Sequence, residues 1–179
     1  LGDEVLVFDI SADAMRKVTL TNIKTLIAGA TLGTPVATTS GVSIPFTGFP
    51  SGTKWIRISF VGVSTNGTSD IQIQIGDAGG IETAGYLSLA RATAATAGFL
   101  VCDATLAAST LNGTITLSLE NSTAFTWTSS GNLYRQGTAL FIGSAGSKSL
   151  SAELTQLVVM TANAVDVFDA GEINVQYGS

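Results

Sequence analysis

Apolar and polar residues alternate with a period of two in one segment after another from residue 32 onward. In residues 54–61, for example, Ile56, Ile58 and Phe60 fall on one face of an extended chain, and Trp55 and Arg57 fall on the other. This alternation is typical of a β-strand with one buried face. It predicts strands at 42–46, 54–61, 70–75, 86–90, 98–102, 114–119, 124–128, 133–142, 150–161 and 172–177.

Short runs rich in Gly, Asn, Asp and Ser separate these segments and predict turns. They lie at 49–52, 65–68, 77–80, 111–114, 129–132 and 144–147. Many strands with frequent turns and no alternating helical pattern indicate an all-β fold, an antiparallel β-sandwich that is jelly-roll-like, over residues 32–179. Residues 90–108 have no apolar stripe, so we expect a surface loop there around the strand at 98–102.

The two ends of the chain have patterns of their own. Residues 1–31 contain short strands at 5–10 and 16–20, followed by a helical turn at 22–28 that Thr21 caps and Gly29 ends. This unit is too small to bury a core, so we expect a linker or trimerisation collar whose apolar face packs on the following domain or on other copies of itself. The tail predicts one long strand over 145–161 and a closing strand within 166–177, forming the last hairpin of the sandwich.

The composition of the chain limits the kinds of partner that it can bind. Hydrophobic residues make up 45% and charged residues only 12%, against about 25% charged in an ordinary domain. Mean hydropathy is +0.42, but no apolar run approaches the ~18 residues of a membrane span, so no membrane insertion is expected. The net charge of −5 and eight unclustered Lys and Arg residues argue against nucleic-acid binding. The low charge indicates that much of the surface is hidden, both by a compact all-β fold and by contacts between subunits.

Catalytic chemistry has few candidate residues. The chain has no histidine, which excludes Ser–His and Cys–His nucleophiles and histidine metal sites, and Cys102 is expected to be a small buried apolar residue. A carboxylate pair, Asp77 with Glu82 or Asp166 with Asp169, could cleave a polysaccharide. Asp in turns and Glu at strand ends more often serve structure. We therefore expect a non-enzymatic protein without a metal or a cofactor.

Aromatic side chains are the better candidates for ligand contact, because sugar recognition uses flat rings and planar polar groups. Each ring could equally pack on a neighbouring strand. The candidate ligand-binding residues are Trp55, Arg57, Tyr86, Trp127, Tyr134 and Arg135.

Several strings along the chain resemble the C-terminal domains of tailed-bacteriophage tail fibre and receptor-binding proteins. They are IPFTGFPSGTKWIRI (44–58), VSTNGTS (63–69), QIGDAGGIETAGY (74–86), WTSSGNL (127–133), GSKSLSAEL (146–154) and FDAGEINV (168–175). At the front, DEVLVFDI (3–10) and RKVTLTNI (16–23) are similar to the linker that precedes such domains. The resemblance covers most of the chain.

The resemblance implies a homotrimeric, non-enzymatic β-sandwich at the tip of a virion fibre, made in the cytoplasm of the host bacterium and carried on the tail or the capsid. Such a tip binds a host surface glycan or protein, and its N-terminus joins other virion proteins. Specificity would then lie in loops such as 64–70, 77–86, 90–97 and 129–135.

Three other functions remain open from the sequence. The first is a structural capsid or head fibre, or a baseplate decoration protein, without a ligand. The second is a polysaccharide depolymerase that uses Asp77 or Glu82. The third is a bacterial carbohydrate-binding module or lectin, which the fibre-like front and the absence of a signal-peptide pattern at residue 1 disfavour.

Overall fold

The computed structural model describes residues 4–9, 14–19, 29–103, 106–107 and 109–179. The described residues form β-strands and no helix, so none of them belongs to a helix that could cross a membrane. The strands are β1 (Glu4–Asp9), β2 (Ala14–Thr19), β3 (Thr31–Leu32), β4 (Val36–Ala37), β5 (Ser43–Thr47), β6 (Trp55–Thr65), β7 (Ile71–Asp77), β8 (Gly80–Ile81), β9 (Leu87–Ala90), β10 (Thr93–Ala95), β11 (Phe99–Cys102), β12 (Leu111–Asn121), β13 (Thr126–Arg135), β14 (Leu140–Ser149), β15 (Gln156–Thr161) and β16 (Phe168–Gly178).

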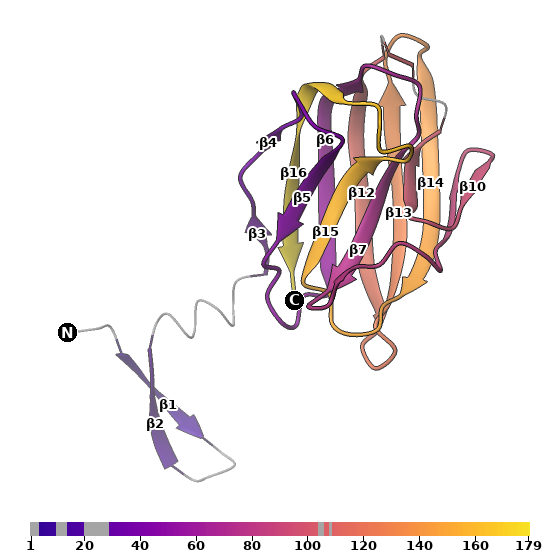
Figure 1. Ribbon diagram of the computed structural model, residues 1–179. Helices are drawn as coiled ribbons and strands as arrows, with labels where there is room; N and C mark the ends of the chain where they lie inside the picture. Colours follow the sequence, from indigo (N-terminus) through magenta and orange to yellow (C-terminus); the bar gives the residue numbers. More distant parts are fainter. Residues whose placement is uncertain (1–3, 10–13, 20–28, 104–105, 108) are drawn as a thin grey trace.

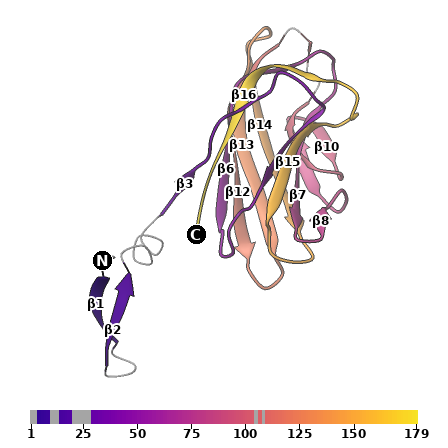
Figure 2. The same cartoon turned by 60° about the vertical axis from the view of Figure 1, so that its left-hand side comes forward.

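Two antiparallel sheets lie face to face and form a sandwich (Figures 1 and 2). The larger sheet has nine strands in the order β10-β9-β14-β13-β12-β6-β16-β3, with β4 also paired to β16. The smaller sheet has five strands in the order β11-β7-β15-β5, with β8 paired to β7. The predicted all-β antiparallel sandwich is therefore confirmed.

The N-terminal segment forms a separate two-stranded sheet, in which β1 pairs antiparallel with β2 from Glu4 opposite Thr19 to Asp9 opposite Ala14. Figure 1 shows this hairpin apart from the sandwich. Both strands were expected from the sequence, at nearly the same residues. The predicted helical turn at 22–28 lies outside the described residues.

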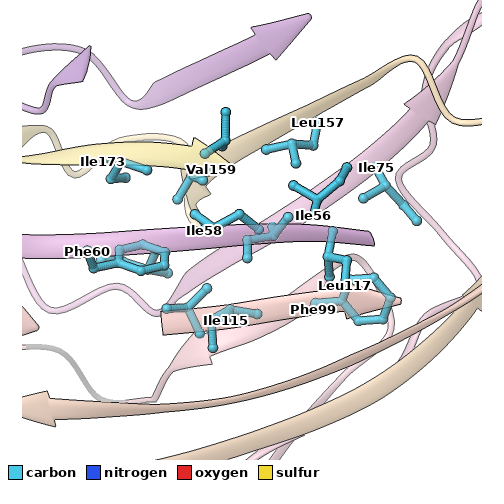
Figure 3. Packing of buried hydrophobic residues seen from close by; sticks show 14 of the residues in the cluster. Ile56, Ile58, Phe60, Ile75, Phe99, Ile115, Leu117, Leu157, Val159 and Ile173 are labelled. Atoms are coloured by element: carbon cyan, nitrogen blue, oxygen red, sulfur yellow. The ribbon is translucent and has the colours of Figure 1, made fainter. Parts of the chain in front are cut away.

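The core fills the space between the two sheets with branched aliphatic side chains and phenylalanine (Figure 3). Ile56, Ile58 and Phe60 of β6 are at most 1% exposed, as the alternation of that segment predicts. From the facing sheet, Ile73 and Val159 pack against them in the same cluster. Branched side chains pack well against their neighbours on the pleated surface of a sheet. The segments with a period of two therefore form the central strands.

β7 departs from the expected half-buried pattern, since all seven of its residues are buried. Gln72 and Gln74, which alternate with the isoleucines, are 4% and 6% exposed. The amide nitrogen of Gln74 donates to the carbonyl oxygen of Ala97 at 2.9 Å, and a Cβ on Gly98 would lie 3.0 Å from the amide of Gln72. The segment before β11 therefore covers the second face of β7.

Three glycine-containing runs that predict turns lie within strands instead. Gly113 lies in β12 opposite Leu133 of β13, with a φ of 145°. The register of β12 on β6 shifts beside it, where two residues of β6, Val61 and Gly62, lie opposite Asn112, and the side chain of Asn112 accepts from the Gly62 N–H at 2.9 Å. Gly131 lies inside β13 and Gly146 inside β14. At both positions the glycine permits a close approach of neighbouring backbone, because an added Cβ would lie 2.4–2.5 Å from a carbonyl oxygen.

The strand predicted at 133–142 is divided by a hairpin turn at 136–139, between β13 and β14. Gly137 has a φ of 98° and Ala139 a φ of 49°, so the chain reverses here on left-handed backbone. The sequence Gln-Gly-Thr-Ala at 136–139 and the residues on either side of it continue the pattern of the predicted strand. The pattern therefore did not predict a turn here.

The long tail strand predicted over 145–161 is two strands in different sheets. β14 ends at Ser149 in the nine-stranded sheet, residues 150–155 cross the end of the sandwich, and β15 begins at Gln156 in the five-stranded sheet. Leu150 and Leu154 are buried within the crossing. β15 pairs with β5 and β7, while β16 pairs with β6, so the prediction of a final hairpin is wrong.

The prediction of a surface loop over residues 90–108 is also wrong in part. It contains β10, which pairs with β9, as well as the expected strand at 98–102, observed as β11. All four residues of β11 are buried, including Cys102, which is 0% exposed as expected. Residues 104, 105 and 108 lie outside the described residues.

Candidate functional site

The nine-stranded sheet has an outer face, turned away from the five-stranded sheet, on which the polar positions of the alternation lie. Strand register aligns these positions in rows. One row runs from Leu89 on β9 through Ala145, Ser130 and Thr116 to Arg57 on β6. Side chains in one row are cross-strand neighbours, about 5 Å apart, so residues distant in the sequence share one surface.

A shallow hollow of about 510 Å³ lies on this outer face, over β12, β13 and β14. Four polar side chains of its lining, those of Thr114, Thr116, Ser130 and Asn132, make no side-chain hydrogen bond within the described part of the chain. The floor of the hollow has almost no side-chain bulk at three of its positions, Gly131, Gly143 and Ala145. The hollow thus offers three hydroxyls and an amide that remain free to bind a ligand.

Three of the predicted ligand-binding residues flank this hollow. Arg57 is exposed and lies opposite Thr116 in the register of β6 and β12. Tyr134 is 48% exposed and follows Asn132 by two residues, so it shares the same face of β13. Trp55 lies two residues before Arg57, on the same face of β6. It is half-buried, because its ring packs where a Cβ on Gly178 would stand.

The guanidinium of Arg57 makes no ion pair with any described residue. Arg57 lies on the outer face of β6, and no charged side chain of the described residues lines the hollow beside it. An unpaired guanidinium carries fixed donors suited to a carboxylate or to vicinal hydroxyls. The outer face therefore combines a planar cation, a phenol ring and uncharged hydrogen-bonding groups.

The other three predicted ligand-binding residues are buried, which argues against the expected contact of their side chains with a ligand. Tyr86 is 0% exposed and stacks edge-on against Phe99. Trp127 is 1% exposed and faces the core from β13. Arg135 is 6% exposed, and its guanidinium donates to Thr138 and to the carbonyl oxygen of Asp103. None of the three offers a ring or guanidinium face to solvent.

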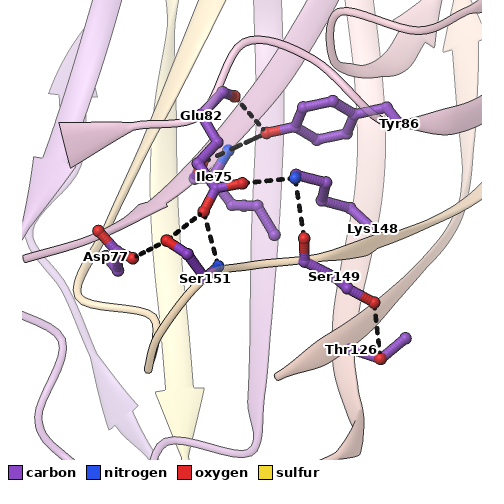
Figure 4. A network of polar contacts seen from close by, with 8 residues as sticks. All are labelled: Ile75, Asp77, Glu82, Tyr86, Thr126, Lys148, Ser149 and Ser151. Carbon is purple, nitrogen blue, oxygen red and sulfur yellow. Dashed lines mark hydrogen bonds and ion pairs between the residues drawn. The ribbon is translucent and has the colours of Figure 1, made fainter. Parts of the chain in front are cut away.

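Tyr86 belongs to a polar network that joins the two sheets (Figure 4). Its hydroxyl donates to the carbonyl oxygen of Glu82 and accepts from the Ile75 N–H, both at 2.8 Å. The Nζ of Lys148 on β14 forms an ion pair with Glu82, 2.5 Å away. Burial raises the pKa of Tyr86 well above its ordinary value. This phenol therefore stays protonated and keeps its hydrogen bonds to the backbone of Ile75 and Glu82.

Asp77 and Glu82, the carboxylate pair considered for catalysis, share the hydroxyl of Ser151. The Ser151 Oγ lies 2.7 Å from Asp77 and 3.0 Å from Glu82. The hydrogen bonds from Ser151 and from the Gly79 N–H lower the pKa of Asp77. Partial burial raises the pKa of Glu82, but hydrogen bonds from Lys148 and Ser151 outweigh it, and the net pKa is lowered. Both carboxylates are thus held ionised by donors of the protein itself.

The second carboxylate pair also has partners within the protein. Asp166 accepts from the Ser69 N–H at 2.7 Å, and its pKa is lowered chiefly through Asn163 and Ser69. Asp169 accepts from the hydroxyl of Ser64. Across the described residues, no group of three or more acidic or cysteine side chains is arranged to hold a metal ion.

Sequence reasoning did not single out Thr114, Thr116, Ser130 and Asn132 as ligand-binding residues, although the loop 129–135 expected to carry specificity contains two of them. The alternation of residues 114–119 marks Thr114 and Thr116 as outward-facing. Ser130 and Asn132 were hidden because residues 129–132 predict a turn, whereas the structure places them on β13. The register of β12 on β13, with Thr116 opposite Ser130 and Thr114 opposite Asn132, brings the four together.

Comparisons with known proteins give this chain no relative. It matches no protein-family model, and neither the curated proteins nor the solved structures compared with it gave a match.

Proposed function

We propose that this chain is a non-enzymatic, homotrimeric fibre domain on the surface of a tailed-bacteriophage virion, jelly-roll-like in its strand arrangement, which attaches to a glycan or protein on the host cell. The observation that supports this most is the hollow on the outer face. It carries four polar side chains that have no hydrogen-bond partner among the described residues. At its margin lie an exposed phenol and a guanidinium that forms no ion pair with those residues.

A hydroxyl-rich glycan fits the chemistry of this surface best. Hydroxyl and amide side chains exchange hydrogen bonds with sugar hydroxyls, and a phenol ring packs on the apolar face of a pyranose. Arg57 adds an anchor for the carboxylate of an acidic sugar. A shallow site on rigid strands also suits a linear polysaccharide, which must lie across the surface.

The test is binding of fluorescently labelled protein to a panel of bacterial strains, with the mass measured by light scattering on the same sample. We expect strain-selective binding by a trimer. Arg57→Ala should weaken that binding by about tenfold or more, because a hydrogen bond to a charged group contributes about 1.5–3 kcal/mol. Lys54→Ala is the matched control, since it removes an exposed cation beside the outer face and should leave binding unchanged.

Two outcomes would favour another function. A trimer that binds no strain would indicate a structural capsid fibre or baseplate decoration. Release of reducing ends from host polysaccharide, lost in Asp77→Asn and Glu82→Gln but retained in Arg57→Ala, would indicate a depolymerase. Equal binding by Arg57→Ala and the wild type would indicate that the ligand binds outside the hollow.

A further inference from the structure

Two exposed aromatic side chains lie next to each other at one end of the hollow. Phe141 on β14 pairs with Tyr134 on β13 in the strand register, and the two residues are 68% and 48% exposed. Both face away from the core, because their strand neighbours Ile142 and Leu133 are buried. Directly opposed side chains on paired strands lie about 5 Å apart. We name Tyr134 and Phe141 the aromatic platform.

The aromatic platform continues directly into the hollow. Asn132 and Gly143 form the next row of the register, on the same face of the two strands, and both line the hollow. Residues two apart on a strand are separated by roughly 7 Å. A group that is held on the platform therefore lies beside the side-chain amide of Asn132.

The rings of the aromatic platform are not used for packing within the protein. Neither ring stacks on another aromatic ring among the described residues. Single exposed apolar residues need no explanation, but here two adjacent rings border a polar hollow. Sugar recognition requires this combination, because a pyranose has an apolar face of C–H groups and a rim of hydroxyls.

Gly143 keeps the floor beside the platform open, and the fold does not require a glycine there. A Cβ at this position would make only an ordinary contact, 3.5 Å from the side chain of Asn132, and its φ lies outside the left-handed region. At Gly131, in contrast, the neighbouring backbone leaves no room for a Cβ. Glycine inside a strand often occurs where a ligand or another backbone approaches closely. At Gly143 no described backbone does.

The aromatic platform and Arg57 are too far apart for one sugar to contact both. β14 and β6 are three strand spacings apart in the sheet, which is about 14 Å. Ala145, in the row of Arg57, lies four residues along β14 from Phe141, which adds about 14 Å in the other direction. The straight line between the two anchors is therefore about 20 Å and crosses the hollow.

From these observations we infer that the ligand of the hollow is a linear oligosaccharide with two anchors. A neutral pyranose stacks on the aromatic platform, and an acidic sugar about 20 Å away places its carboxylate on Arg57. Gly143 leaves room for the sugars between them. The inference rests on the attachment function proposed above; it names the ligand class of that site and adds Phe141 and Gly143 to its binding residues.

The probe is the surface polysaccharide purified from a strain that the wild type binds. Phe141→Ala should weaken binding about threefold to tenfold, because a ring contact is lost, and Phe141→Tyr should retain binding because the ring remains. Gly143→Val should abolish binding by filling the floor of the hollow. In a second sample the carboxylates of the polysaccharide are reduced to alcohols. There Arg57→Ala should bind like the wild type, while Phe141→Ala should still bind more weakly.

Val165→Ala is the matched control for loss of an exposed apolar side chain. Val165 is 72% exposed and lies between β15 and β16, outside the lining of the hollow. The substituted side chains are exposed or absent, so folding should be unaffected, and a thermal unfolding curve of each variant checks this.

Four results decide between the possibilities. Weaker binding by Phe141→Ala and Gly143→Val, with normal binding by Phe141→Tyr and Val165→Ala, supports the inference. Wild-type binding by Phe141→Ala and Gly143→Val, with weaker binding by Arg57→Ala, overturns it and leaves the attachment function standing. An undiminished effect of Arg57→Ala on the reduced polysaccharide overturns the acidic anchor. A wild type that binds no strain overturns the attachment function and the inference together.

Discussion

Trp127 is the largest side chain of the core, and its indole N–H has no acceptor within the described residues. The ring faces inward from β13, opposite Leu119 of β12 in the register. Its contribution to stability is therefore packing alone. At the residue scale this is the opposite of the expected role, in which the indole would be offered to a ligand.

Trp127→Phe should cost clearly less stability than Trp127→Ala. Removing a large buried aromatic side chain costs about 3–5 kcal/mol, whereas phenylalanine keeps much of the packing and loses no hydrogen bond. Urea unfolding of both variants, followed by circular dichroism, measures the difference. Equal losses in the two variants would mean that the indole N–H has a partner essential to the fold.

At the scale of a strand, Gly131 decides how closely β12 and β13 can lie. A Cβ at this position would stand 2.4 Å from the carbonyl oxygen of Thr114 and 2.6 Å from the side chain of Ile115. Gly143 on the neighbouring strand has only an ordinary contact, 3.5 Å from the side chain of Asn132. The two glycines thus differ in packing although both lie within strands of the same sheet.

Gly131→Ala should destabilise the protein by about 1–3 kcal/mol, the usual cost of overpacking a core. Gly143→Ala should be close to neutral, because it also restricts the unfolded chain. The measurement is the free energy of unfolding of each variant in urea. If the two substitutions cost the same, the sheet adapts to a Cβ at 131 and the close approach is not required.

At the scale of the whole molecule, the Asp77–Ser151–Glu82–Lys148 network joins the sheets. Lys148 belongs to the nine-stranded sheet, Asp77 ends β7 of the five-stranded sheet, and Glu82 follows β8. Both carboxylates have a folded-state pKa below the ordinary values of 3.8 and 4.5. A lowered folded-state pKa stabilises the fold above the ordinary pKa, and that contribution disappears as the pH falls through the folded-state pKa.

The free energy of unfolding should therefore decrease below about pH 4.5, and less steeply in Glu82→Gln than in the wild type. Urea unfolding at a series of pH values between neutral and acidic measures both slopes. Glu120→Gln is a suitable control because Glu120 is exposed, with no ion pair to a described residue. Parallel curves for the wild type and Glu82→Gln would show that the network does not couple folding to protonation.

Local pattern identified the strands well wherever one face is buried. Ile56, Ile115 and Leu117 are buried as their alternation predicts. It failed where glycine permits a close approach of neighbouring backbone instead of a turn, as at Gly113 and Gly131, since both uses require the same residue. It also failed at residues 150–155, where the crossing between sheets retains two buried leucines and so resembles a strand.

By itself, the sequence determined the fold class, the faces of the central strands and the absence of histidine chemistry, because these depend on residue type and on near neighbours along the chain. Only the tertiary structure decided which aromatic residues are accessible, because burial depends on the partner strands: Tyr86 and Trp127 are covered, while Tyr134 remains exposed. It also decided that Thr116, Ser130 and Arg57 share one surface, since strand register joins residues that are distant in the chain.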